Sequence, residues 1–269
     1  MVKYLNGFSA IIKGVDRGKP AAMQRKGMKL TKEVVSLPRA LSKLGFCSRS
    51  DAVKLIQEGR VTVDGRVVRD PTFRVNYIRQ KIAVDGKVVK PAPKVYYAFH
   101  KPKGVVTARN DPLGRKTIYD YIKTDRWVFH VGRLDKDTSG LLILTNDTQL
   151  AERITNPKNH IPKTYVVKVR GRVTEEALQK LRSGVLLHDG PTMPAKVEVI
   201  RYTNGNTWLK MTVYEGRNRL IRRMCLAVGH QVMKLIRIKI GKLELGDLKP
   251  GEYRELTPEE VKLLTESDE

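Results

Sequence analysis

The sequence predicts an α+β protein with two domains, a small basic domain followed by a larger one built on a mixed, mainly antiparallel sheet. Several strand-like apolar runs in the second half of the chain follow one another without a helix between them, which favours such a sheet over a doubly wound one. Ahead of them lie two short helical patterns and two hairpin patterns, set apart by the proline-containing linker at 91–93. At 269 residues the chain is long enough for two cores.

The charge balance is the strongest compositional signal. Fifty-two Lys and Arg residues stand against 28 Asp and Glu, a formal charge of +24, which indicates a polyanionic partner, most commonly nucleic acid. The sequence has no apolar run of about 18 residues and no long basic helix with an aromatic face, so no membrane association is expected. Two widely separated cysteines, Cys47 and Cys225, and an N-terminus without a secretory pattern predict a cytoplasmic protein without disulfides.

The two ends of the chain are predicted to lie outside the folded domains. Residues 1–36 are basic and lack periodicity, which is typical of a disordered extension. Such a segment can be a solvated tail, a basic arm that adds sequence-independent affinity for RNA, or both at once. Residues 261–269 are expected to form an acidic tail.

Residues 37–92 are expected to fold as the small domain. One short helix is predicted to end at Gly45, and a second helix, capped by Ser48 or Ser50, is predicted to end at Gly59. Two repeated units with an Asp-Gly pair between apolar residues predict two hairpins, because this pair suits a tight hairpin turn. The predicted hairpins cover residues 61–68 and 82–89.

Residues 93–260 are expected to form the larger domain. Apolar runs predict strands at 95–100, 127–131, 141–144, 165–169, 197–202, 208–213 and 232–240. Helical spacing predicts helices at 117–122, 148–154, 174–181 and 219–228.

The most informative segment is the polar loop from Gly132 to Gly140, which joins two of these predicted core strands. It would hold Asp135 at a strand end, with Arg133 two positions before it, and a carboxylate beside a cation can stay ionised in a partly dry cleft. A loop Asp more commonly caps a turn through its side chain, so spacing alone leaves both interpretations open. A calcium loop is set aside because its twelfth position is Asn146 instead of Glu.

Three further segments carry polar residues that could join this loop. The Lys-Pro-Lys-Gly turn at 101–104 follows a predicted strand and, taken alone, is typical of a basic surface turn. Tyr165 lies in a predicted strand, where a tyrosine usually packs in the core and alternatively places its ring over a base. If a helix begins at Arg219, its arginines project away from an apolar stripe. Arg222 lies at the edge of that stripe, so it could point into a cleft and keep a carboxylate ionised.

Residues 39–52 and 56–65 resemble the S4-like RNA-binding domain. The matching runs read Arg-Ala-Leu-Ser-Lys-Leu-Gly-Phe-Cys-Ser-Arg-Ser-Asp-Ala and Ile-Gln-Glu-Gly-Arg-Val-Thr-Val-Asp-Gly. In that family a pair of helices presents basic residues to structured RNA. The resemblance therefore implies RNA contacts for Arg39, Lys43, Arg49, Lys54 and Arg60.

Four spaced motifs of the larger domain resemble the RNA pseudouridine synthases of the RsuA/RluB/RluE/RluF branch. The resemblance covers residues 37–260 in the family's domain order and departs from it at Leu220, where many members carry a polar residue. The motifs are Lys101-Pro102-x-Gly104, Gly132-Arg133-Leu134-Asp135-x-x-Thr138-x-Gly140-Leu141, Lys163-x-Tyr165-x-Val167 and Glu215-Gly216-Arg217-Asn218-Arg219-x-Ile221-Arg222-Arg223-Met224.

The resemblance implies a role for each matching residue. Asp135 would be the catalytic carboxylate that attacks the ribose or otherwise promotes departure of uracil, after the uridine has left its stack. Arg133 would hold the flipped state, Tyr165 would stack on the uracil and assist proton removal, and Arg222 would pair with Asp135. Ile221 would line the pocket. Further RNA contacts are expected from Lys101, Arg217, Arg219 and Arg223.

The family needs no metal and no organic cofactor, and the histidines of this sequence show no metal-ligand clustering. The expected partner is ribosomal RNA, 23S in preference to 16S, within an assembling subunit, and the expected oligomeric state is a monomer. The main alternative is a non-catalytic RNA-binding or ribosome-assembly protein, which the joint presence of Asp135, Tyr165 and Arg222 disfavours. A metal-dependent nuclease is disfavoured because it needs several converging carboxylates.

Overall fold

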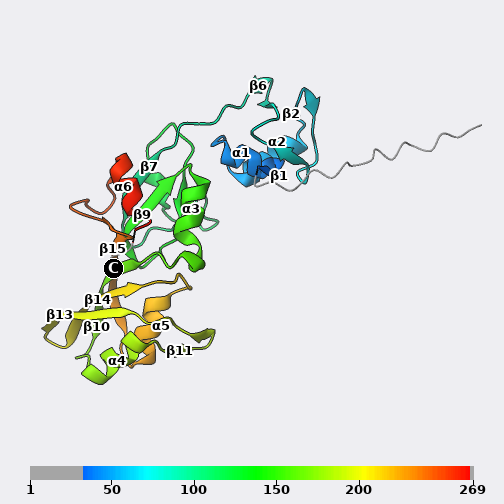
Figure 1. Cartoon of the computed structure of the whole chain (residues 1–269). Helices are drawn as coiled ribbons and strands as arrows, with labels where there is room; N and C mark the ends of the chain where they lie inside the picture. The colour runs from blue at the N-terminus through cyan, green and yellow to red at the C-terminus, as the bar shows by residue number, and fades with distance from the viewer. Residues whose placement is uncertain (1–32, 267–269) are drawn as a thin grey trace, which may run out of the picture.

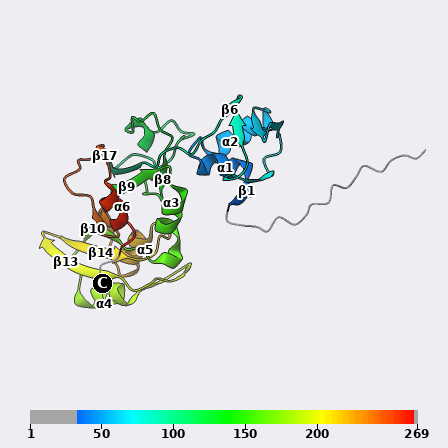
Figure 2. The ribbon, with the colours of Figure 1, turned by 45° about the horizontal axis from the view of Figure 1, so that its top comes forward.

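The computed structural model describes residues 33–266 as a small N-terminal domain and a larger C-terminal one. Figures 1 and 2 both show the small domain at one end of the larger, joined to it by the chain between β6 and β7. The predicted basic extension falls largely on residues 1–32 and therefore lies outside the described residues, as does the end of the predicted acidic tail. Among the helices of residues 33–266, none is both long and apolar enough to cross a bilayer.

The small domain contains two helices and two small antiparallel sheets within the described residues. One sheet has the strand order β3-β2-β5-β6, and the other pairs β1 with β4. Its elements are β1 (Val34–Ser36), α1 (Leu37–Lys43), α2 (Arg49–Gln57), β2 (Val61–Val63), β3 (Arg66–Val67), β4 (Arg74–Asn76), β5 (Ile82–Val84) and β6 (Lys87–Val88).

Local sequence signals explain how these elements begin and turn. The Ser48 hydroxyl accepts a hydrogen bond from the Asp51 backbone N–H at 3.0 Å, so Ser48 is the N-cap of α2. In both hairpins the Asp and the Gly of the turn have positive φ, as the tight hairpin turn requires. The fold of this domain also includes residues ahead of 37, because β1 pairs with β4 and Val35 packs in the core.

The larger domain is built, within the described residues, on a nine-stranded sheet. Its main path has the order β13-β14-β10-β15-β9-β7-β17, with β16 added to β15 and β8 to β9. Among the strand pairs of residues 33–266, β9 with β15 is parallel and the others are antiparallel. The prediction of a mixed, mainly antiparallel sheet is thus confirmed.

The strands of this domain are β7 (Tyr96–Lys101), β8 (Phe129–Val131), β9 (Ser139–Thr145), β10 (Lys163–Arg170), β11 (Leu186–Leu187), β12 (Gly190–Pro191), β13 (Lys196–Thr203), β14 (Asn206–Val213), β15 (Val232–Ile240), β16 (Leu243–Glu244) and β17 (Tyr253–Glu255). The helices are η1 (Ile118–Asp120), α3 (Thr148–Thr155), η2 (Pro157–Asn159), α4 (Glu175–Ser183), α5 (Leu220–Ala227) and α6 (Pro258–Leu263). The helix predicted at 117–122 is only the 3₁₀ turn η1, and the hairpin β11–β12 had no counterpart in the prediction.

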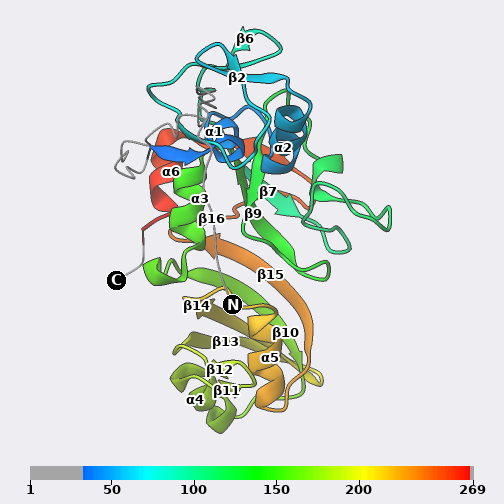
Figure 3. The ribbon, with the colours of Figure 1, turned by 90° about the vertical axis from the view of Figure 1, so that its right-hand side faces the viewer.

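Helices α4 and α5 pack on one face of this sheet, against β13, β14, β10 and β15 (Figure 3). The alternation along β10 shows which face is covered, because Val167 and Val169 are fully buried in the core beneath the helices. Tyr165 lies on the same face, while Val166 and Lys168 point to the other.

The parallel junction between β9 and β15 depends on Gly140. This residue pairs with Arg237, has a φ of 112°, and a Cβ added to it would lie 2.2 Å from the Arg237 carbonyl oxygen. Only glycine fits such a close approach of two backbones. Arg237 is buried and its Nε donates a hydrogen bond to the Leu141 carbonyl at 2.8 Å, so β9 is held on both sides of Gly140. The loop that contains Asp135 therefore leads into a rigid strand.

Candidate active site

The loop from Gly132 to Thr138 connects β8 to β9 and is tied to its surroundings by backbone contacts. The Thr138 N–H donates to the Asp135 carbonyl at 3.0 Å, which closes a tight turn. The Thr107 hydroxyl donates to the Leu134 carbonyl at 2.7 Å and accepts from the Leu134 N–H at 3.3 Å. These contacts fix the backbone on either side of Asp135, whose side chain is half-buried.

His130 holds the other end of this loop. Its Nδ1 lies 2.7 Å from the Gly132 carbonyl oxygen, and because a carbonyl only accepts, Nδ1 carries the proton. Burial lowers the pKa of the imidazole, and the positive charges of Arg133 and Arg109 act in the same direction, so the ring is neutral near pH 7. Sequence patterns did not single out His130 or Thr107, because each contacts backbone atoms of the loop and not a side chain of the motif.

Lys101 lies beneath the loop and is completely buried. Its ammonium donates to the carbonyl oxygens of Pro102 at 2.9 Å, Thr138 at 2.8 Å and Lys136 at 3.4 Å. Burial lowers the pKa of Lys101 to about 8, and the Asp135 and Asp137 carboxylates partly oppose that shift. Lys101 was predicted to contact RNA; in the structure its side chain is buried and its ammonium bonds carbonyl oxygens of the loop, so it supports the loop.

Arg222 reaches the loop from α5. Its Nη2 donates to the Asp137 carbonyl at 3.0 Å and its Nη1 to the Val232 carbonyl at 3.4 Å. Burial and the neighbouring Arg219 lower the pKa of the guanidinium, while the charges of Asp135 and Asp137 raise it. Within residues 33–266, however, no ion pair joins Arg222 to Asp135. The two terminal nitrogens of the guanidinium bond carbonyl oxygens instead, one of them on the loop, and the buried Nε has no hydrogen-bond partner within the described residues.

Tyr165 and Ile221 bound the site on the sheet side. Tyr165 pairs in register with Arg237, which pairs in turn with Gly140, so the three residues form one row across β10, β15 and β9. With strands about 4.8 Å apart, Tyr165 lies roughly 10 Å from Gly140. Ile221 is buried in the core cluster against which Tyr165 packs. The tyrosine ring thus has an apolar floor and lies beside the loop.

Arg133 and Arg219 are both exposed, and neither donates a hydrogen bond or forms an ion pair within the described residues. Arg219 has a φ of 49° and is the N-cap of α5, which begins at Leu220, one residue later than predicted. Both guanidinium groups are therefore available to an anionic ligand beside the loop.

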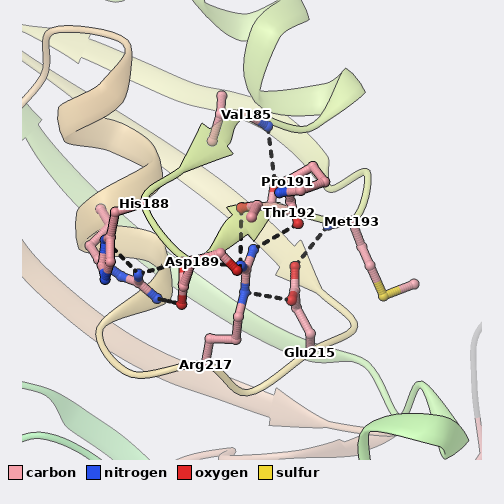
Figure 4. A network of polar contacts seen from close by, with 10 residues as sticks. Val185, His188, Asp189, Pro191, Thr192, Met193, Glu215 and Arg217 are labelled. Carbon is pink, nitrogen blue, oxygen red and sulfur yellow. Dashed lines mark hydrogen bonds and ion pairs between the residues drawn. The ribbon is translucent and has the colours of Figure 1, made fainter.

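Arg217 has carboxylate partners, which Figure 4 shows, and Arg223 has one as well. Arg217 pairs with Asp189 at 3.1 Å and with Glu215 at 2.9 Å, and it also donates to carbonyls of the β11–β12 hairpin. Arg223 pairs with the same Asp189 at 2.8 Å. The expectation that both bind RNA is replaced by a structural role, because their donors hold the hairpin against α5. Asp189 was missed because it lies in a hairpin that no sequence pattern predicted.

The basic residues of the small domain divide into two groups. Arg39, Lys43 and Arg49 line a cavity of about 420 Å³ between the domains, which is also bounded by Gly132 of the catalytic-domain loop. Lys54 is exposed on α2 but does not line this cavity, and Arg60 pairs with Asp85 at 2.6 Å and with Glu58 at 3.2 Å. Three of the five predicted RNA contacts thus converge next to the start of the loop. The structure gives Arg60 carboxylate partners instead.

In the described part of the chain, no group of three or more His, Cys, Asp or Glu side chains converges in a way that could hold a metal ion. The half-buried carboxylate of Asp135 lies near the positive charges of Lys101 and Arg222. An apolar surface at Tyr165 and Ile221 lies beside it. Such a site combines a carboxylate and nearby cations with an apolar surface that suits a planar, uncharged group.

Comparisons with known proteins agree with this geometry. The family model described as RNA pseudouridylate synthase matches residues 95–227, and the S4 domain model matches residues 35–76. The chain is 45% identical over 232 residues to an uncharacterized RNA pseudouridine synthase of Aquifex aeolicus, covering 86% of this chain and 93% of the relative. It is 42% identical over 231 residues to ribosomal large subunit pseudouridine synthase B of Bacillus subtilis, covering 85% and 94%.

A solved structure described as a pseudouridylate synthase superposes with a TM-score of 0.63 at 32% identity, covering 86% of this chain and 99% of that one. The matches span both domains and include the loop, β10 and α5, which carry the residues described above. The chain therefore belongs to the RsuA/RluB family of RNA pseudouridine synthases, with an S4 RNA-binding domain ahead of the catalytic domain.

Proposed function

We propose that this enzyme isomerises a specific uridine of large-subunit ribosomal RNA, with Asp135 as the catalytic carboxylate. The observation that carries the proposal is the position of Asp135 in a turn held by Thr107 and Lys101, with Tyr165 on the adjoining sheet face. The preference for the large subunit rests on the 42% identity to a ribosomal large subunit pseudouridine synthase of Bacillus subtilis.

In the proposed reaction the target uridine leaves its stack and enters the space over Tyr165. Asp135 attacks the ribose, or otherwise promotes departure of uracil, so that the bond between C1′ and N1 breaks. The uracil turns and C5 bonds to C1′, which breaks the bond from C1′ to the Asp135 oxygen where the carboxylate had attacked and releases the carboxylate. The proton on C5 is then lost and N1 gains one, so the product is an isomer of the substrate. Tyr165 is placed to stack on the ring and assist the proton removal.

The surrounding cations would act on charge and position. Lys101 and Arg222 hold the loop backbone and supply positive charge near Asp135. Arg133, exposed at the loop, would occupy the space that the flipped nucleotide leaves. The exposed Arg219 and the group of Arg39, Lys43 and Arg49 would contact phosphates and position the RNA without reading its sequence.

The decisive test replaces Asp135 with Asn and compares it with Asp137→Asn, which removes a carboxylate from the same loop. We expect Asp135→Asn to abolish pseudouridine formation while RNA affinity stays within about tenfold, because phosphate contacts dominate binding. Asp137→Asn should retain most of the activity, since Arg222 contacts the Asp137 carbonyl and not its side chain. Full activity in Asp135→Asn would contradict the proposed mechanism.

The target is identified in cells that lack this protein. Carbodiimide mapping of pseudouridines in both ribosomal RNAs should show a site missing from the large-subunit RNA, restored by the wild-type gene and not by Asp135→Asn. A site missing from the small-subunit RNA would overturn the assignment of the substrate. Unchanged pseudouridines together with a defect in subunit assembly would favour a non-catalytic role in ribosome assembly.

A further inference from the structure

The face of the large sheet opposite the active site carries a tryptophan among three cations. Lys168, Arg201 and Lys234 place their charged groups 5.6, 5.4 and 5.9 Å from the centre of the Trp208 ring. Alternation along β10 puts Lys168 on the face away from Tyr165 and the helices α4 and α5. This group of four residues is called the Trp208 row below.

The register of the sheet makes the group a single row. Arg201 of β13 pairs with Trp208 of β14, Trp208 pairs with Lys168 of β10, and Lys168 pairs with Lys234 of β15. The row crosses four adjacent strands and, at about 4.8 Å per strand, spans roughly 14 Å. A β-bulge at Ile200 shifts the register of β13 so that Arg201 lies opposite Trp208.

This arrangement works against stability, because like charges on directly paired residues of a sheet repel each other. Lys168 and Lys234 are such a pair, and within residues 33–266 no carboxylate forms an ion pair with Lys168, Arg201 or Lys234. On the same face Glu198 pairs with Lys210 instead, at 3.8 Å. Among the described residues, the three cations thus lack a neutralising group.

The chemistry of the row fits one kind of ligand. Arg201 and Lys234 are exposed and Trp208 is half-buried, so the ring and its cations are accessible to a ligand. A half-exposed indole ring stacks on a nucleobase, and cations beside it neutralise phosphates, which is how single-stranded nucleic acid is bound without sequence preference.

We propose that the Trp208 row is a second RNA-binding surface, which holds a single-stranded segment of the substrate RNA on the side of the sheet opposite Asp135. A base of that segment stacks on Trp208, and its phosphates contact Lys168, Arg201 and Lys234. The inference rests on RNA as the substrate of this enzyme, and it adds an anchoring site to the S4 domain and the catalytic loop.

The chain has two tryptophans, so in the full-length Trp127→Phe protein Trp208 is the only indole. An oligouridylate of about ten nucleotides is titrated into it, with binding followed by anisotropy of labelled RNA and by tryptophan emission. We expect Trp208 emission to be quenched as binding saturates. Polyglutamate, a polyanion without bases, should quench much less. Unchanged emission at saturating RNA, or equal quenching by polyglutamate, overturns the proposal.

The charges are tested in the same protein by changing Lys168, Arg201 and Lys234 together to Gln. Removing three phosphate contacts from a single strand should reduce the salt slope by about 2 and weaken binding about 50-fold at 0.15 M salt. The control changes three exposed lysines elsewhere on the domain to Gln, and its slope should not move. Equal effects of the two variants would overturn the proposal. The control lysines are Lys123, Lys249 and Lys262.

Two further measurements distinguish a failure of this inference from misfolding and from a failure of the proposed mechanism. The Lys168, Arg201 and Lys234 variant should unfold at the same or a higher temperature than its parent, because it removes like-charge repulsion, so weaker binding cannot be ascribed to misfolding. Asp135→Asn should leave the Trp208 quenching unchanged. Activity retained in Asp135→Asn would contradict the proposed mechanism alone, whereas an RNA-insensitive Trp208 would contradict the second surface alone.

Discussion

Replacing Gly140 with Ala tests whether the close approach of β9 and β15 holds the catalytic loop in place. A Cβ at this position would lie 2.2 Å from the Arg237 carbonyl oxygen and 2.5 Å from the Arg237 nitrogen, both of them backbone atoms that cannot rotate away. The φ of 112° adds backbone strain for any residue with a side chain. The strain costs about 1–3 kcal/mol, and the overpacking adds about 1–3 kcal/mol. We expect Gly140→Ala to lower the free energy of unfolding by roughly 2–6 kcal/mol.

The matched control is Gly190→Ala in the β11–β12 hairpin. Gly190 has a similar φ of 103°, but a Cβ there meets no atom within 4 Å, so this variant carries the backbone strain without the clash. It should cost only about 1–3 kcal/mol. Urea unfolding followed by circular dichroism measures both variants against the wild type. Equal destabilisation by the two substitutions would refute the reasoning, because the clash with β15 would then contribute nothing.

Three other outcomes follow from contacts in the structure. The Lys101 pKa of about 8 is below the unfolded value of 10.5, so the unfolded state binds more protons between these values. The unfolding free energy of the wild type therefore rises with pH across that window, and measured relative to Lys101→Met it should rise by on the order of 3 kcal/mol. If urea titrations show a difference between the two proteins that does not change with pH, the burial effect is contradicted. Ser48→Ala should destabilise the small domain by about 1 kcal/mol in thermal unfolding through loss of the α2 cap, and an equal loss in Ser50→Ala would refute that assignment. Asp189→Asn should free Arg217 and Arg223 for phosphates and steepen the salt dependence of RNA binding by about 0.7 for each new contact to a single strand, whereas an unchanged slope in an anisotropy titration would show that the arginines stay on the hairpin.

Local signals were sufficient to predict many elements of the fold. Periodicity placed most strands and helices within a few residues, and the Asp-Gly pairs predicted both hairpins of the small domain, because each signal depends on neighbouring residues. The helix expected at 117–122 shrank to a single 3₁₀ turn. The short hairpin β11–β12 escaped detection because its strands contain only two residues each.

Several contacts of the candidate site residues differ from those that the sequence predicted. Arg222 contacts the loop backbone, and Tyr165 packs against both the cluster with Ile221 and the one with Leu134, while the predicted roles of these residues stay predictions. Sequence reasoning assigned Lys101, Arg217, Arg219 and Arg223 of the motifs alike to RNA contacts. It could not distinguish the buried Lys101 from the exposed Arg133, because burial depends on residues far away in the chain.

By itself, the sequence determined the class of the fold, the family and the identity of the candidate catalytic residues, since these depend on residue type, period and spacing along the chain. The tertiary structure alone decided which cations support the protein and which face a ligand. Lys101 meets Thr138, 37 residues on, and Arg223 meets Asp189, 34 residues before it, only after the strands have paired. The Trp208 row likewise exists only through the register of four strands, because cross-strand neighbours are set by pairing and bulges and not by sequence distance.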